Sequence, residues 1–320
     1  MIDFSVILVS YNSTQEQIEK TLRSIVEQKD VTFEIIICDD GSTDNHFVDI
    51  KEYLHSKKYP DDRVLFMESE KNQGTVCNAL KGIRNARGKY SKLIGVGDLL
   101  YHEYTLHDIK EFMDQHQSDI CFGLLRGYVQ KSENIEFRQQ CSPRDIDAYR
   151  RKDIKRIRRN IMLCEDWVSG ASIFARTDYY LKYISLLEGK VIYCEDWATG
   201  LSAMDNIYPD LYDRYVVWYE VSEGISTNPN SKFREMIKKD NEVFWTVFDE
   251  RAERIHSKIV DKLVKKRVRK KKADNWPVAL QLIYKSLANP EMLIYELNVR
   301  SQRMSNAFIA KDTRKGFLDE

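Results

Sequence analysis

The first 95 residues alternate short apolar runs with stretches of helical periodicity, and this alternation limits the chain to few folds. Apolar runs of strand length occupy 4–9, 33–38, 63–67 and 90–94, and helical patterns occupy 14–28, 44–56 and 75–86. Strands that alternate with helices at this spacing form a mainly parallel sheet covered by helices on both faces. We therefore predict an α/β fold whose ligands bind beyond the carboxyl ends of the strands.

The start of the first predicted helix has a sequence signature of its own. Ser13 and Glu16 have the spacing of a capping box, in which the hydroxyl accepts from the Glu16 amide while the Glu16 side chain reaches back. This helix is therefore expected to begin at Thr14.

The charge distribution changes near residue 229. The whole chain carries 50 Lys+Arg and 50 Asp+Glu, but residues 231–320 hold 21 Lys+Arg against 13 Asp+Glu, a charge of +8. The remaining 29 and 37 give residues 1–230 a charge of −8, and the pattern after residue 230 is helical alone. We predict one domain over 1–229, with halves of about 1–98 and 99–229, and a basic helical region over 230–320.

The cysteines and the N-terminus indicate a cytoplasmic protein. Six cysteines lie far apart without a C-x-x-C pair, so neither a zinc site nor a disulfide framework is suggested. The chain opens directly into an apolar run without a signal peptide, and no stretch reaches the roughly 18 apolar residues that span a bilayer.

Acidic residues follow the second predicted strand directly. Asp39 and Asp40 precede Gly41-Ser-Thr-Asp44, a sequence equally typical of a turn with a helix N-cap. The functional alternative is that a carboxylate at the end of a strand accepts from a base or a ribose. Both interpretations are open from these residues alone.

The first strand is followed by Ser10-Tyr11-Asn12, which contains no glycine. A dinucleotide fingerprint and a P-loop are therefore absent, and a diphosphate would need another source of positive charge. Carboxylates that hold a metal ion are the usual alternative. After the strand over 90–94, Gly95-Val96-Gly97-Asp98 offers one carboxylate, although a glycine-rich turn explains the same residues.

The ordered set of motifs resembles family 2 glycosyltransferases, which are inverting enzymes with the GT-A (nucleotide-diphospho-sugar transferase) fold, over residues 1 to about 227. The motifs are Val9-Ser-Tyr-Asn12, Ser24-Ile25 with Gln28, Phe33-Glu34, Asp39-Asp40-Gly-Ser-Thr-Asp44, Asn72-Gln-Gly74 with Asn78, Ala86-Arg-Gly-Lys-Tyr90, Asp98, Ser169-Gly-Ala171 and Glu195-Asp196-Trp197. The resemblance implies a mixed, mainly parallel sheet with flanking helices, here with a C-terminal helical extension.

The resemblance also implies a donor site for a UDP-sugar. Asp39 or Asp40 would accept from the uracil ring, with Tyr11 close to the base. The other donor-side residues would be Ser10, Asn12, Asn72, Gly74 and Asn78. Asp98 would bind Mn²⁺ or Mg²⁺ between the two phosphates. The sequence departs from the family pattern at Val96, where the first acidic residue of D-x-D is expected.

The family's catalytic pair is similar to Glu195-Asp196, which follows a predicted short strand over 190–193. Asp196 would deprotonate the acceptor hydroxyl, and Gly170, Ala171 and Trp197 would lie on the acceptor side. The same four residues, Cys-Glu-Asp-Trp, also occur at 164–167. The second copy is preferred because the segment 170–174 precedes it, as in the family. The first copy, with Glu165 and Asp166, is expected to be a cap or a wall of the acceptor pocket.

Two basic stretches remain. Residues 150–159 predict an amphipathic helix, with Ile154 and Ile157 on its apolar face and a solvated charged face. Residues Lys265 to Lys272 are denser in charge, and they favour either a solvated helix or contact with an anionic membrane surface or partner. Nucleic acid is not expected, because no recognition motif accompanies this run.

Together these features predict an inverting glycosyltransferase that moves a hexose or N-acetylhexosamine from a UDP-sugar to a glycan or polyprenyl-diphosphate-linked acceptor in bacterial surface polysaccharide synthesis. The protein would be cytoplasmic and peripheral to the membrane. A sugar nucleotidyltransferase is one alternative, although it calls for a glycine-rich basic loop after the first strand. A catalytically inactive glycan-binding or scaffold module is the other, because of Val96.

Overall fold

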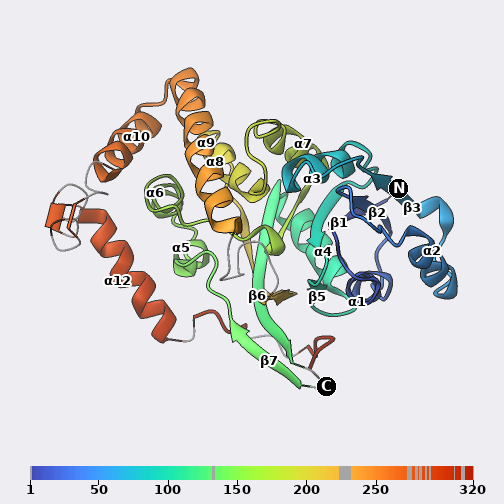
Figure 1. Cartoon of the computed structure of the whole chain (residues 1–320). Helices are drawn as coiled ribbons and strands as arrows, with labels where there is room; N and C mark the ends of the chain where they lie inside the picture. The colour runs from blue at the N-terminus through green and yellow to red at the C-terminus, as the bar shows by residue number, and fades with distance from the viewer. Residues whose placement is uncertain are drawn as a thin grey trace.

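The computed structural model describes residues 2–131, 134–222, 232–271, 276–277, 280, 283–284, 287, 290–305, 307–310 and 314–319. Helices lie on both faces of one large mixed sheet, and further helices from the C-terminal part extend to one side (Figure 1). The predicted α/β class is therefore confirmed.

The strands of this sheet are β1 (Phe4–Ser10), β2 (Phe33–Asp39), β3 (Val64–Glu68), β4 (Tyr90–Gly95), β5 (Leu99–Leu100), β6 (Ile120–Lys131), β7 (Asn134–Gln139), β8 (Ile173–Arg176) and β9 (Asp210–Glu220). Their order is β3-β2-β1-β4-β8-β6-β9-β5, and β7 pairs with β6. The four strands predicted within the first 95 residues are mutually parallel, with Ser10 beside Asp39 and Val9 beside Gly95. Their carboxyl ends therefore meet at one edge, where the candidate donor residues were expected.

The helices are α1 (Gln15–Val26), α2 (Phe47–Ser56), α3 (Thr75–Arg84), α4 (Thr105–His116), α5 (Ile146–Arg150), α6 (Ile154–Cys164), α7 (Thr177–Ile184), α8 (Ala198–Met204), α9 (Lys232–Ile255), α10 (Lys258–Lys271) and α12 (Pro290–Met304). Alternate residues of the parallel strands point to opposite faces. Ile7 and Ile36 pack with α3, α7 and α8, whereas Val6 and Ile35 pack with α1 and α4.

Two helices begin later than the sequence predicted. Thr14, and not Ser13, is the N-cap of α1, and it forms the capping box with Gln17. A capping box is therefore present as predicted, but it is formed by Thr14 and Gln17, one residue later than the predicted Ser13 and Glu16. The second helix begins at Phe47 instead of 44, because the Asp44 carboxylate accepts from the His46 amide in a turn.

The predicted strand over 190–193 is wrong. The amides of Ile192 and Tyr193 donate to the Asp240 carboxylate of α9, and the Ile192 carbonyl accepts from Val76 at the start of α3. These backbone groups form their hydrogen bonds with α3 and α9 and not with a neighbouring strand, so the segment is a loop held between these two helices.

The basic stretch over 150–159 is divided between α5 and α6, with Asp153 as the N-cap of α6. Ile157 is buried as predicted, but Ile154 is 42% exposed. The expected solvated charged face is wrong for Arg150, which forms a bidentate pair with Asp213, and for Arg156, which pairs with the buried Asp145. Much of this charge is therefore used within the fold.

Helix α9 is part of the main core. Its Phe244 and Trp245 are buried against Trp167 and Trp197, the tryptophans of the two Cys-Glu-Asp-Trp copies, whose ring centroids lie 6.1 Å apart. Figure 1 shows α9 beside α8. The predicted boundary near 229 lies outside the described residues. In the described part of the chain, none of the helices combines the length and apolar character that crossing a membrane requires.

Candidate active site

Two acidic residues at the carboxyl end of β2, Asp39 and Asp40, are buried and accept hydrogen bonds from backbone amides of nearby loops. The Asp39 carboxylate accepts from the Ser42 amide (2.8 Å) and from the Ser42 hydroxyl (2.5 Å). The Asp40 carboxylate accepts from the amides of Gln73 (2.9 Å) and Gly74 (2.8 Å), and burial raises its pKa. The turn expected for these residues is therefore present, but the expected helix N-cap is not, because α2 begins after His46. Each carboxylate oxygen still has a second lone pair for a ligand.

Gly74 has no room for a side chain. Its φ is +89°, and a Cβ atom would lie 2.2 Å from the Cγ2 atom of Ile192 and 2.6 Å from its carbonyl oxygen. Ile192 is the loop residue that α9 holds through Asp240. The Asp40 loop, the start of α3 and the segment before Glu195 are therefore in direct contact.

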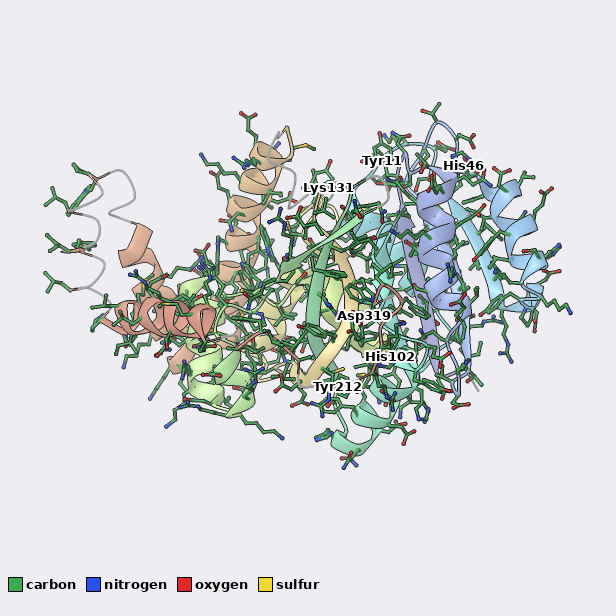
Figure 2. All side chains as sticks on the ribbon, turned by 90° about the horizontal axis from the view of Figure 1, so that it is seen from below. Tyr11, His46, His102, Lys131, Tyr212 and Asp319 are labelled. Carbon is green, nitrogen blue, oxygen red and sulfur yellow. The ribbon has the colours of Figure 1, made fainter. Side chains whose placement is uncertain are left out.

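The other donor-side residues surround this loop. Asn12 holds the turn after β2, since its side-chain oxygen accepts from the Thr43 amide. Tyr11 is 50% exposed, and Figure 2 shows it with His46 and Lys131 at one end of the sheet, opposite Tyr212. Such an exposed ring at the carboxyl end of β1 can stack on a base.

Three predicted donor residues differ in their surroundings. Ser10 is nearly buried, and Asn72 is exposed on the loop before Gly74. Asn78 is buried in α3, where its amide nitrogen donates to the Cys38 carbonyl (2.8 Å). Within the described part of the chain no donor reaches its side-chain oxygen. Asn78 therefore holds the end of β2 through the Cys38 carbonyl, and its side-chain oxygen can still accept a hydrogen bond.

Asp98 lies in the turn between β4 and β5. One of its carboxylate oxygens accepts from the Glu220 amide at the end of β9 (3.0 Å). Burial raises the pKa of Asp98 to about 7, although this bond and the charge of Lys92 oppose the rise. Among the described residues no donor bonds to the second oxygen, so this oxygen is available to bind an ion.

The residues around Asp98 fit a divalent ion in a limited way. Val96 and the flanking glycines add no carboxylate, and among the described residues no group of three His, Cys, Asp or Glu side chains converges. Mg²⁺ commonly takes only one or two carboxylates and completes its octahedron with substrate phosphates and water. Asp98 can therefore hold a metal together with a diphosphate, but the protein supplies no complete cage.

Glu195 and Asp196 lie in a single 3-10 turn, Glu195–Trp197, that leads into α8. The Gly170 amide donates to the Asp196 carboxylate (3.1 Å), and both acids line a small cavity with Tyr180. Burial raises the pKa of each acid, and their mutual repulsion raises that of Glu195 further. Such a pair can keep one proton near neutral pH and act as a proton acceptor in the other member.

The first Cys-Glu-Asp-Trp copy has a different environment. The Asp166 carboxylate accepts from the amides of Arg144 (2.7 Å) and Asp145 (3.1 Å), and the side chain is 2% exposed. Burial raises its pKa to about 6. Both oxygens are thus engaged in holding the backbone that leads into α5, whose N-cap residue is Asp145.

Two residues of the site were missed by the sequence analysis. Lys92 in β4 is completely buried, and the charges of Asp98 and Glu195 both act on it. Asp240 in α9 is 2% exposed and holds the loop before Glu195. The signal for Lys92 was present, since a lysine inside an apolar strand of a sheet covered on both faces must be buried. Asp240 carries no such signal, because an acid in a polar helix resembles its solvated neighbours.

Comparison with known proteins provides an independent test. The model of the family described as Glycosyl transferase family 2 matches residues 5–173, more than half of the chain. An uncharacterised glycosyltransferase of Methanocaldococcus jannaschii is 26% identical over 156 residues, which cover 48% of this chain and 49% of that protein. The poly(ribitol-phosphate) beta-N-acetylglucosaminyltransferase TarP of Staphylococcus aureus is 30% identical over 122 residues, which cover 37% of this chain and 35% of TarP. These matches span about half or less of each relative's length.

The fold has relatives among solved structures. The crystal structure of S. aureus TarS 1–349 in complex with UDP-GlcNAc superposes with a TM-score of 0.53 at 18% identity, over 90% of this chain and 79% of that one. The complex of the same protein with UDP gives 0.54 at 17% identity, over 86% and 73%. This likeness confirms the GT-A fold.

Proposed function

Because the chain belongs to glycosyl transferase family 2 and is a glycosyltransferase, we propose that it transfers a hexose or N-acetylhexosamine from a UDP-sugar, with inversion, to a glycan or polyprenyl-diphosphate-linked acceptor of a bacterial surface polysaccharide. The observation that carries the proposal is the pair Glu195 and Asp196, fixed by the Gly170 amide and by a loop that touches Gly74 of the donor side.

The donor proposal has support from the relatives. TarS was solved with UDP-GlcNAc, and TarP is named as an N-acetylglucosaminyltransferase, so UDP-GlcNAc is the first donor to test. In this chain Asp39 or Asp40 would accept from the uracil N–H through a free lone pair, and Tyr11 would stack on the ring. Gly74 and Asn78 would form part of the wall of the donor site next to the uracil ring.

Asp196 would be the general base. Its carboxylate would take the proton of the acceptor hydroxyl while that oxygen forms a bond to the anomeric carbon and the bond to the UDP oxygen breaks. Attack on the face opposite the leaving group inverts the anomeric centre. The raised pKa suits the role, since a more basic carboxylate takes a proton more readily. Trp197 and Ala171 would border the acceptor.

Asp98 would hold the Mn²⁺ or Mg²⁺, and when bound the ion would supply positive charge to the departing diphosphate. The chain's own part in this step is to present one free carboxylate oxygen at the end of β4. The bond from the Glu220 amide fixes the orientation of the carboxylate.

A direct experiment separates this proposal from its alternatives. Purified protein is incubated with UDP-GlcNAc, UDP-Glc or UDP-Gal and Mn²⁺, and released UDP is measured with and without candidate acceptors. Slow release of UDP supports transfer. A sugar nucleotidyltransferase would instead need a sugar phosphate and a nucleoside triphosphate and would release diphosphate, and an inactive glycan-binding module would release nothing while retaining affinity for glycans.

The proposed site of action is the anionic inner face of the membrane, reached through the basic stretch at 265–272. Lys265 is exposed, but Lys266 pairs with Glu291, and Arg267 is buried over the Trp245 ring. Residue 272 and the side chains of 268–271 lie outside the described residues. A variant for co-sedimentation with anionic vesicles should therefore spare Arg267. Loss of salt-sensitive pelleting on neutralising the remaining basic residues would support the proposal, and unchanged pelleting would contradict it.

A further inference from the structure

Lys92 is a fully buried charged side chain near the site that the proposed mechanism does not use. It lies in the middle of β4 with none of its surface exposed, and its ammonium sits 4.6 Å from the centre of the Phe174 ring. Strand neighbours on the same face, Tyr90 and Ile94, belong to the apolar core. A charge in such surroundings is costly unless other groups compensate for it.

The ammonium is bonded to the turn that carries the catalytic contact. Nζ donates to the carbonyl of Ala171 (2.5 Å) and more weakly to that of Ile173 (3.3 Å). Ala171 is the middle residue of the 3-10 turn Gly170–Ser172. The amide of Gly170, one residue earlier, donates to Asp196. A short chain of bonds therefore runs from Lys92 through this turn to the proposed base.

Two of the groups that act on the charge of Lys92 belong to the site. Burial lowers the pKa of Lys92 to about 7, while Asp98 and Glu195 of the site, and Cys121 of β6, oppose this effect. Reciprocally, Lys92 lowers the pKa of both Asp98 and Glu195. Lys92, when protonated, is thus electrostatically coupled to both Asp98 and Glu195.

We propose that Lys92 is a positioning residue of the transferase site: its buried ammonium fixes the Gly170–Ser172 turn against Asp196 and supplies a built-in positive charge between Asp98 and Glu195. This inference rests on the proposed function. A purely structural side chain at this position would need only to fill the space, and a methionine would do so without the cost of burying a charge. The ammonium acts on Asp98 and Glu195, to which the bound donor of the proposed function would add a diphosphate.

The test compares two substitutions with a matched control. Lys92→Met removes the charge and the hydrogen bonds at nearly constant volume, and Lys92→Gln removes the charge but keeps an N–H donor. Lys89→Met is the control, because Lys89 is a partly exposed lysine just before β4 whose ion pair with Asp114 lies outside the site. Thermal melting, UDP binding by calorimetry, and the pH profile of kcat with UDP-GlcNAc are measured for all four proteins.

We expect Lys92→Met to lose about tenfold or more in kcat, since small displacements of a catalytic group have effects of this size. Lys92→Gln should lose less. Both should move the limb of the pH profile governed by Glu195 and Asp196 to higher pH, by about half a unit or more, because a nearby cation lowers the pKa of a carboxyl group. Besides Lys92, the titratable groups that act on this pair or feel its charge are Tyr180 and Cys194, and neither is altered by the substitutions.

Each outcome decides the question. If both Lys92 variants match Lys89→Met in kcat and pH profile, the proposal is overturned. A fall in kcat without movement of the limb would leave Lys92 a packing role and would also overturn it. Should Lys92→Met fail to fold, the position of the limb in Lys92→Gln decides. If wild-type protein neither binds nor turns over a UDP-sugar, the proposed function itself fails, and this is seen before any variant is compared.

Discussion

The duplicated Cys-Glu-Asp-Trp sequence allows one substitution to be made in two environments. Asp196→Asn and Asp166→Asn are chemically identical changes, thirty residues apart in the same four-residue context. We expect Asp196→Asn to abolish transfer with little effect on folding, and Asp166→Asn to weaken folding with little effect on the turnover of folded molecules.

The magnitudes follow from the hydrogen bonds. The Asp196 carboxylate accepts from the Gly170 amide, and the side-chain oxygen of an asparagine can keep that bond. The amide cannot take the proton, so a loss of about 10²-fold or more in kcat is expected, equivalent to about 2.7 kcal/mol in the barrier. Asp166 uses both oxygens on backbone amides, so an asparagine must turn its NH₂ group toward one of them. A buried N–H without a partner costs about 1–3 kcal/mol of folding free energy.

The assay measures kcat with UDP-GlcNAc, UDP binding by calorimetry and the melting temperature of both variants beside the wild type. In the wild type, activity should fall as the pH drops through the pKa of Asp196, which burial places above the value of about 3.9 for an ordinary aspartate. Near-normal turnover of Asp196→Asn together with an inactive but stable Asp166→Asn would refute the assignment of the two copies.

Three further predictions concern the donor side and the loop that supports the pair. Asp98→Ala should weaken UDP-sugar binding mainly when Mn²⁺ is present, and calorimetry with and without chelator checks this; unchanged wild-type turnover in chelator would contradict a metal at Asp98. Gly74→Ala should lower the melting temperature more than Gly189→Ala, because both positions have positive φ but only the Cβ at residue 74 would collide with Ile192; equal losses would mean that the loop moves aside. Asp240→Asn should reduce kcat at nearly constant UDP affinity, since it loosens the loop before the catalytic pair; kinetics that match the wild type would show that the loop is held otherwise.

The parallel half of the fold was predictable because three of its strands, β1, β2 and β4, are buried on both faces. Every residue of β2 is buried, and its central Ile35–Cys38 is an apolar run that stands out from the helices beside it. The second half was harder to predict, because β8 and β5 pair with strands distant in sequence and are short. The segment 190–193 shows where prediction from local sequence fails. It has the composition of a strand, but its amides donate to Asp240 of α9, almost fifty residues later in the chain.

The candidate site was predictable where a side chain follows a strand end, as with Asp40 and Asp98. It was not predictable where a residue acts on another residue. Lys92 acts through the carbonyl of Ala171, and Asp240 acts through backbone amides. Such roles depend on which segments the fold brings together, and neither strand periodicity nor motif order contains that information.

The position of Asp240 changes how the C-terminal region relates to the catalytic domain. A basic extension that served only to reach a membrane could be joined to the domain by a flexible linker, with no contact to the site. Instead α9 contributes Asp240 to the loop before Glu195, and it contributes Phe244 and Trp245 to the aromatic cluster around Trp197. A surface contact made by α10, which packs on α9 through Trp245, is thus connected mechanically to the base. If α10 binds a membrane as proposed, this binding is expected to affect turnover through α9, because a helix packed into the core transmits displacement to the loop before Glu195 that it holds.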